Sequence, residues 1–303
     1  MKFYPEGKNP ELAKSFSTVN ELKSAMQNRE ILESKVLLCD REHNLHVDLG
    51  AVRGIIPRQE GAIGIDDGSV RDIALISKVN KSVCFEVLGF ERNIYSDEIA
   101  ILSRKRVQER CQSEFLDNLV CGDIIDATVT HLEKFGAFID IGCGINALIP
   151  IDMLSVSRIS HPNERLIEGQ EIKVVLKKIE DGKLTFSLKE LLGTWQENAD
   201  RFCAGETVTG VVRSIEQYGV FVEIAPNLAG LAEVQDNLFV GQEVSVYVKS
   251  VIPDKMKIKL VIVSAFNQVA EITPLTYFID SDHIDSWQYS PDNSIKDIYT
   301  NFE

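Results

Sequence analysis

The chain has 303 residues, of which 44% are hydrophobic and 26% charged, as in an ordinary globular protein with two or three domains. Its apolar runs are too short to span a bilayer, and residues 1–11 lack the apolar segment of a signal peptide, so we predict a cytoplasmic protein without membrane contact. The formal charge of −14 argues against a nucleic-acid partner, but residues 264–303 hold one lysine and seven acidic residues, so much of the excess is in the tail.

The N-terminal part predicts a helical segment followed by a small β domain. Residues 17–27 predict a helix, with Thr18 as its N-cap and Glu21 three residues later. Five strands are expected next, and they form a degenerate copy of a unit that is clearer further along the chain. Their ranges are 34–42, 43–50, 52–58, 71–80 and 82–91.

The clearest copy of this unit follows a helical connection that we predict over residues 101–119. Its five strands are expected at 123–133, 134–144, 145–151, 170–180 and 184–190. Residues 152–169 form an irregular or helical insert between the third and fourth strands. Five short strands with such an insert are typical of a Greek-key barrel of the OB type.

A further copy repeats the same order of strands after a third helix predicted within residues 188–202. Its strands are expected at 206–216, 217–225, 228–234, 242–252 and 257–263, and its insert is short. The fold class is therefore mainly β, with three tandem five-stranded OB barrels joined by short helices. The aromatic residues of the acidic tail indicate that it packs in part on the third barrel. The predicted domain ranges are 1–30, 31–100, 101–119, 120–192, 193–204, 205–263 and 264–303.

Two copies share an aromatic–glycine–small–phenylalanine segment, which contains Phe135 and Phe138 in one copy and Tyr218 and Phe221 in the other. Residues three apart in a regular strand face opposite sides, so we expect a bulge at the intervening glycine to place both rings on one face. Phe138 and Asp140 would then point outward. A core role suits an isolated strand aromatic, but the repeated placement favours rings that stack on unpaired bases.

Basic side chains lie close to these rings in the sequence. Arg158, His161 and Arg165 belong to the insert of the middle copy, where they either line a groove or form salt bridges on a solvated loop. Lys134 precedes the first ring and Arg213 lies on the first strand of the third barrel. Either is placed to meet a phosphate.

Residues 122–149, together with 154–162, 169–172 and 183–192, resemble the S-one RNA-binding domain, and the tandem copies resemble bacterial ribosomal protein S-one. The resemblance covers residues 121–192 strongly, 205–260 well and 31–100 faintly. It implies that the two aromatic pairs contact RNA. The resemblance also implies that the family's acidic position in the last turn corresponds to Asp181 and Asp254. The family's basic position at the start of the fifth strand corresponds to Lys183 and Lys257.

The resemblance also marks departures from the family pattern. A family histidine after the third strand falls on Pro150 and Glu233, so this contact is absent from both copies. In the first copy the aromatic positions hold His43 and His46, for which a structural role is expected. That barrel would then serve for docking or spacing.

No nucleotide-binding, zinc-protease or serine-hydrolase motif occurs, and Cys39 with two nearby histidines is an incomplete metal set. We therefore expect no catalytic residue, no metal and no cofactor. The six scattered cysteines predict buried, reduced thiols. The prediction is a non-catalytic protein that binds single-stranded RNA, namely mRNA, in translation, with the small ribosomal subunit as a possible partner. The alternatives are an OB-fold protein-interaction or scaffold module, and an RNA-binding accessory of RNA decay or transcription.

Overall fold

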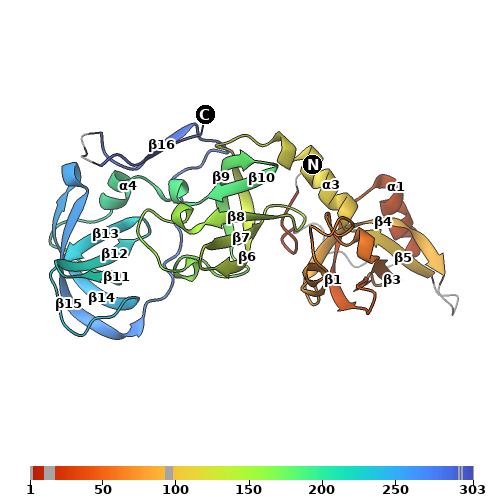
Figure 1. Ribbon diagram of the computed structural model, residues 1–303, viewed down its shortest axis with the longest axis horizontal. Helices are drawn as coiled ribbons and strands as arrows, with labels where there is room; N and C mark the ends of the chain where they lie inside the picture. The colour runs from red at the N-terminus through yellow and green to blue at the C-terminus, as the bar shows by residue number, and fades with distance from the viewer. Residues whose placement is uncertain (1–2, 10–17, 93–97, 293, 295, 303) are drawn as a thin grey trace. The chain divides into compact units, whose positions relative to one another are not determined.

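A computed structural model describes residues 3–9, 18–92, 98–292, 294 and 296–302 (Figure 1). The chain divides into two compact units, one of residues 1–119 with 140–146 and one of residues 120–139 with 147–303. The described strands include three closed five-stranded barrels. The predicted mainly β fold with three barrels is confirmed.

The first barrel closes in the order β1-β2-β3-β5-β4, with β3 and β5 parallel. Its strands are β1 (Leu32–Cys39), β2 (Leu45–Asp48), β3 (Arg53–Ile56), β4 (Ser82–Arg92) and β5 (Glu98–Ser103). Helix α1 (Val19–Asn28) precedes it, and the hydroxyl of Thr18 accepts a hydrogen bond of 3.3 Å from the Glu21 N–H, as predicted. Ser17, the first residue of the expected helix, lies outside the described residues.

The prediction of the fourth and fifth strands in this barrel was wrong. Residues 71–80 contain the short helix α2 (Ile73–Ile76), which follows the 3-10 turn η1 (Arg58–Glu60) in the insert. A short apolar run suits a helix or a strand equally, so its pattern could not separate the two. Residues 82–91 therefore form the fourth strand, and the fifth occupies 98–103.

The shift of the last strand also moves the helical connection. Helix α3 (Lys105–Glu114) begins four residues later than the predicted start at residue 101, because residues 101–103 belong to β5. The 3-10 turn η2 (Leu116–Asn118) follows it.

The middle barrel has the order β10-β8-β7-β6-β9, with β8 and β10 parallel. Its strands are β6 (Ile124–Glu133), β7 (Gly136–Asp140), β8 (Asn146–Pro150), β9 (Glu171–Glu180) and β10 (Lys183–Ser187). Its insert contains two 3-10 turns, η3 (Ile151–Met153) and η4 (Pro162–Glu164). The buried side chains of this barrel include Ala127, Val129, Ile139, Ile141, Val174 and Leu176.

The third barrel has the order β11-β12-β13-β15-β14. Its strands are β11 (Thr207–Glu216), β12 (Gly219–Ala225), β13 (Leu228–Ala232), β14 (Gln242–Ile252) and β15 (Lys257–Val269). The turn η6 (Pro253–Lys255) joins the last two. Strand β15 extends past residue 263, where we expected it to end, because it stays paired with β14 as far as Gln242↔Val269.

The connection between these two barrels contains η5 (Lys189–Leu192) and the helix α4 (Trp195–Ala199). Thr194 and Glu197 cap α4 reciprocally, each side chain accepting a hydrogen bond from the other residue's N–H. The third predicted helix is thus present, but it is short. Trp195 belongs to the hydrophobic core of the third barrel.

The tail contacts both barrels of its compact unit. Its strands β16 (Ser286–Gln288) and β17 (Tyr299–Asn301) pair as a small antiparallel sheet. Trp287 and Tyr289 belong to the hydrophobic core cluster of the third barrel, which confirms the predicted packing of the tail on this barrel. Phe302 instead packs with Ile124 of the middle barrel, a contact that the sequence did not indicate.

The cysteines only partly match the expectation. Cys84, Cys111 and Cys143 are buried free thiols, whereas Cys39 and Cys121 are half-buried and Cys203 is exposed. Among the described residues, no helix has both the length and the apolar character needed to cross a membrane. Nor do three His, Cys, Asp or Glu side chains of this part of the chain gather in a metal-binding group.

Candidate nucleic-acid interface

The four aromatic side chains form two similar pairs on the middle and third barrels. The ring centroids of Phe135 and Phe138 lie 5.9 Å apart with an interplanar angle of 90°, and those of Tyr218 and Phe221 lie 6.2 Å apart at 87°. Phe135 is 56% exposed and Tyr218 is 69% exposed, while the second ring of each pair is half-buried. Edge-to-face pairing is a favourable geometry for aromatic rings, and it leaves ring faces open to solvent.

The predicted glycine bulge does not explain why the rings meet. Tyr218 lies in the turn between β11 and β12 rather than in a strand, so the strand alternation does not apply to it. Gly219 is in regular register opposite Glu216, and the irregularity falls on β11 between Val212 and Ser214. The prediction of a bulge at Gly219 was therefore wrong.

The glycines instead allow neighbouring strands to approach closely. A Cβ on Gly219 would lie 2.6 Å from the Ala232 carbonyl oxygen, and a Cβ on Gly136 would lie 2.4 Å from the Ile149 carbonyl oxygen. Both distances are shorter than a carbon–oxygen contact allows. Each glycine thus lets the strand that follows the aromatic residue pack closely against the next strand.

Asp140, two positions after Phe138, does not point outward as we expected. Asp140 is buried and accepts hydrogen bonds from the N–H groups of Glu6, Gly142 and Gly144, at 2.9, 2.9 and 3.0 Å. Burial, followed by the neighbouring Glu6 carboxylate, raises the pKa of Asp140 to about 6. The equivalent residue of the third barrel, Glu223, is also buried.

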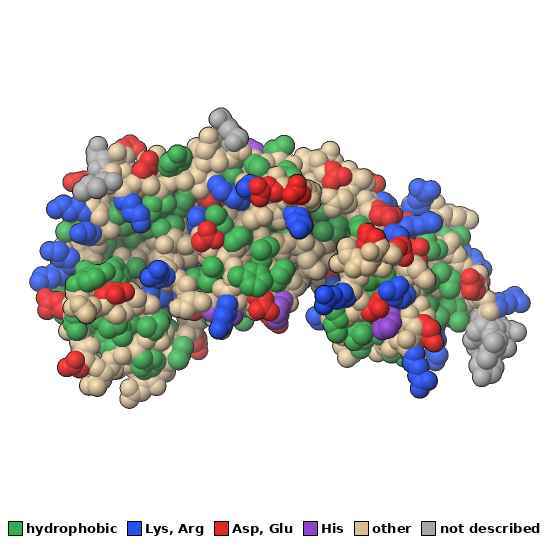
Figure 2. Space-filling view, in the orientation of Figure 1, with side chains coloured by type: hydrophobic (Ala, Val, Ile, Leu, Met, Phe, Trp, Pro, Cys, Tyr) green, Lys and Arg blue, Asp and Glu red, His purple; other side chains and the backbone are tan. Residues whose placement is uncertain are grey.

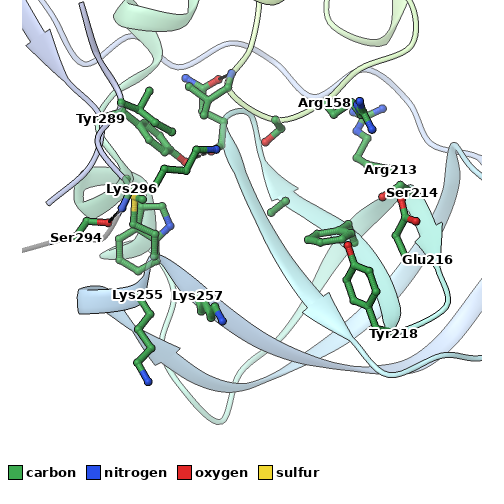
Figure 3. A pocket seen from close by; sticks show the side chains of 18 residues that line it. Arg158, Arg213, Ser214, Glu216, Tyr218, Lys255, Lys257, Tyr289, Ser294 and Lys296 are labelled. Atoms are coloured by element: carbon green, nitrogen blue, oxygen red, sulfur yellow. Dashed lines mark hydrogen bonds between the residues drawn. The ribbon is translucent and has the colours of Figure 1, made fainter.

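A groove of about 680 Å³ lies against the aromatic pair of the third barrel (Figure 3). Its walls come from several parts of one compact unit: the insert of the middle barrel, α4, strands β11, β12 and β13, the turn leading into β15, and the tail. The aromatic pair, Arg158 and Lys257 all line it, so the groove brings together residues that were predicted separately. Asp254 is exposed in the adjoining turn but does not line the groove.

The groove is basic although the chain is acidic. Arg158, Lys255 and Lys257 are exposed, and none of them forms an ion pair with another residue of the described ranges. Figure 2 shows Lys and Arg side chains, in blue, gathered around the third barrel beside apolar side chains in green. Charges more than about 8 Å away are largely screened at physiological salt, so this local surface matters more than the total.

Arg213 also lines the groove, but its charge is already paired. Its Nε donates to Glu223 at 2.6 Å, and its Nη1 donates to Glu164 of the middle barrel's insert. Arg165 from the same insert is buried and donates to the other carboxylate oxygen of Glu223 and to Ser155. These two arginines join the barrels, whereas Arg158 is exposed.

The remaining predicted residues of the middle barrel are placed differently. Lys134 is exposed in the turn beside Phe135, and Lys183 is exposed at the start of β10. Asp181 occupies the preceding turn with a φ of 48°. His161 caps η4, since its Nδ1 accepts a hydrogen bond of 3.1 Å from the Asn163 N–H.

The first barrel holds its two histidines against carboxylates. The Nε2 of His46 lies 2.9 Å from an Asp40 oxygen, and the Nδ1 of His43 lies 3.9 Å from an Asp72 oxygen. Such contacts agree with the structural role expected of these histidines.

Several residues of the groove were not predicted. Lys255, Trp195 and four tail residues line it as well: Tyr289, Ser294, Lys296 and Ile298. The aromatic content of the tail indicated packing, but nothing in the sequence pattern placed the tail beside the aromatic pair.

Comparisons with known proteins agree with this geometry. Residues 121–189, which cover the middle barrel, match the model of the S1 RNA binding domain, which is the S-one domain that these residues resemble. The small ribosomal subunit protein bS1 of Staphylococcus epidermidis is 30% identical over 294 residues, which cover 91% of this chain and 70% of that protein.

Two further relatives are proteins of the same name. That of Staphylococcus aureus (strain COL) is 34% identical over 75% of this chain and 56% of its own length. That of Rhodopseudomonas palustris is 31% identical over 79% of this chain and 44% of its own length. The chain thus spans about half the length of these two relatives. It belongs to the family of the small ribosomal subunit protein bS1, and its middle barrel is an S1 RNA binding domain.

Proposed function

We propose that the protein binds single-stranded RNA without catalysis, through the aromatic pairs of its middle and third barrels, and that it acts in translation. The observation that carries this proposal is the repeated edge-to-face pair of one exposed ring and one half-buried ring on two barrels of one compact unit. An exposed ring contributes nothing to a core, whereas each base stacked on such a ring stabilises a complex by about 1–3 kcal/mol.

The rings favour an unpaired strand over a duplex. Stacking on Phe135 or Tyr218 requires a base whose face is free, and the bases of a stable duplex are stacked on each other. Two modest sites on one chain also reinforce each other, because the second contact becomes intramolecular once the first has formed. The two pairs would therefore bind one flexible RNA segment more tightly than either pair alone.

The basic residues beside the rings support a phosphate contact. Lys134 and Lys183 would serve the middle barrel, and Lys257 would serve the third. Asp181 and Asp254, on the adjoining turns, would accept hydrogen bonds from a base or a ribose hydroxyl and not from a phosphate. His161, which caps a turn of the insert, is a secondary candidate. Arg213 lines the same groove as Tyr218, but its charge is already paired with two carboxylates, so we expect no direct phosphate contact from it.

Binding to labelled RNA tests this function. An unstructured oligonucleotide of about twelve nucleotides should bind more tightly than a hairpin duplex, and its affinity should fall steeply as salt rises. An interaction module for proteins, the alternative function, would bind neither RNA measurably. An affinity that does not change with salt would also contradict the proposal.

The link to translation rests on the relatives, which are small ribosomal subunit proteins by name. We propose that the chain binds mRNA at or near the small subunit, in the cytoplasm. Sedimentation of a cell extract tests this step, since the protein should travel with small subunits. Cross-linking in cells, with sequencing of the attached RNA, would instead recover decay intermediates or nascent transcripts if the protein serves RNA decay or transcription.

A further inference from the structure

The part of the tail around Trp287 and Tyr289 packs on the third barrel. The side chains of Trp287 and Tyr289 are buried in the barrel's core cluster. The Trp195 N–H donates to the Tyr289 carbonyl oxygen at 2.9 Å, and the Tyr289 hydroxyl donates to the carbonyl oxygen of Asn227. The segment is therefore anchored at the groove and is not a free tail.

Hydrogen bonds join the chain on the two sides of Ser294 and Lys296. The Tyr289 N–H donates to the Ile298 carbonyl oxygen at 2.8 Å, and the Ile298 N–H donates to the Ser290 hydroxyl at 2.8 Å. Ser294 and Lys296 lie between these bonds, and both line the groove. Figure 3 shows them on the opposite side of the groove from Tyr218.

The charge of this wall is opposite to that of the tail as a whole. Residues 264–303 contain seven acidic residues and one lysine, and that lysine is Lys296. The tail residues that line the groove are Tyr289, Ser294, Lys296 and Ile298, none of which is acidic. Lys296 is exposed and lies on the side where Figure 3 also shows Lys255 and Lys257.

We propose that this segment is part of the RNA site: the sugar–phosphate backbone of a strand that stacks on Tyr218 and Phe221 passes between Lys296 on the tail and Lys255 with Lys257 on the barrel. The inference rests on the proposed function. Lysine side chains supply charge to phosphates without reading sequence, and the Ser294 hydroxyl adds a donor for a phosphate or an acceptor for a 2′-hydroxyl. The third barrel thereby binds a longer RNA segment than its ring pair alone.

The test compares Lys296→Ala with Lys249→Ala, using a labelled twelve-nucleotide oligouridylate and the full chain. Lys249 is an exposed lysine of β14 that does not line the groove, so its substitution makes the same change in charge elsewhere. One lost phosphate contact should weaken binding about fivefold at 0.1 M salt and reduce the slope of log affinity against log salt by about 0.7. Lys249→Ala should alter neither quantity.

The same loss should appear with an oligoadenylate, because a backbone contact does not depend on the base. Substitution of an exposed lysine leaves the fold intact, and equal melting temperatures of the two variants check this. Cross-linking of 4-thiouridine RNA should in addition label the peptide containing residues 286–302.

Three outcomes would overturn the inference. If Lys296→Ala binds RNA as tightly as Lys249→Ala does, Lys296 does not contact the RNA. Tighter binding by Lys296→Ala would mean that the segment obstructs the groove instead of extending it. If neither the unmodified chain nor the Tyr218→Ala/Phe221→Ala variant binds RNA, the proposed function fails, and this inference fails with it. If only the ring variant loses RNA affinity, the proposed function stands, and the comparison of the two lysine variants decides the inference.

Discussion

Arg165 and Glu223 form an ion pair between the middle and third barrels in which the side chains are only 2% and 4% exposed. The second oxygen of the Glu223 carboxylate accepts a hydrogen bond of 2.6 Å from Arg213, which also pairs with Glu164. The buried carboxylate thus offsets the charge of two arginines from different barrels. This arrangement ties the insert of one barrel to the aromatic strand of the next.

We expect Glu223→Gln to destabilise the protein by about 3 kcal/mol, because it leaves the buried guanidinium of Arg165 without a carboxylate partner and Arg213 with Glu164 alone. Urea denaturation measures this loss. The control is Glu180→Gln, which breaks the exposed pair of Glu180 with Lys178 and should change stability by less than about 0.5 kcal/mol. Equal stability of the two variants would show that the buried network does not hold the barrels.

The aromatic pairs predict a selective loss of RNA affinity. Phe138→Ala combined with Phe221→Ala should weaken binding of an unstructured RNA far more than binding of a duplex, since each stacked base contributes about 1–3 kcal/mol. Tyr247→Ala is a matched control, because Tyr247 is an exposed aromatic of the third barrel that does not line the groove. Fluorescence anisotropy measures all three proteins. If the double variant binds as the parent does, the rings are not the binding surface.

The glycines beside the rings predict a loss of stability. An alanine at Gly219 would place its Cβ 2.6 Å from the Ala232 carbonyl oxygen, so the strands would have to separate, at a cost of about 1–3 kcal/mol. Hydrogen exchange of the β12 and β13 amides should therefore become faster. Gly89→Ala is the control, since its Cβ meets no atom within 4 Å. Unchanged protection in Gly219→Ala would refute the close-approach explanation.

The unit that contains the first barrel predicts a dependence of stability on pH. Burial, together with the carboxylates of Glu6 and Asp140, raises the pKa of Glu33 to about 7 despite its hydrogen bond from the Gly7 N–H. Burial opposes ionisation of Glu6 too, but the cations of Arg104 and Lys78 outweigh it and lower the pKa of Glu6 to about 2.

The two shifts act in opposite directions. The folded state binds the proton of Glu33 more tightly than the unfolded chain does, so this contribution to stability is lost as the pH rises from about 4.5 through 7. Asp140 acts in the same direction up to about pH 6, whereas the contribution of Glu6 is lost only as the pH falls from 4.5 toward 2. Stability of this unit should therefore decline between pH 5 and pH 8.

Glu33→Gln tests this prediction, because glutamine still accepts a hydrogen bond from the Gly7 N–H but does not titrate. Urea denaturation at pH 5 and pH 8 should show a smaller decline for the variant than for the parent. A decline of the same size in both proteins would assign the pH dependence to other groups.

Much of the fold was predictable because alternating strands and repeated segments are local features. In the middle and third barrels, the order of the strands followed from period-two alternation and from the repeat itself. The first barrel shows the limit of this reasoning. Its residues 73–76 form an apolar run that suits either a strand or a helix, and only the pairing of β3 with β5 excludes the run from the barrel.

The sequence by itself determined that two barrels carry the same aromatic pair, because the order of residues in a turn and the following strand decides which rings can meet. Only the tertiary structure decided what surrounds that pair. It buried Asp140 and Glu223, paired Arg213 with two carboxylates, and brought Lys296 from the tail to the groove. These outcomes depend on contacts between residues far apart in the chain, and local periodicity carries no information about them.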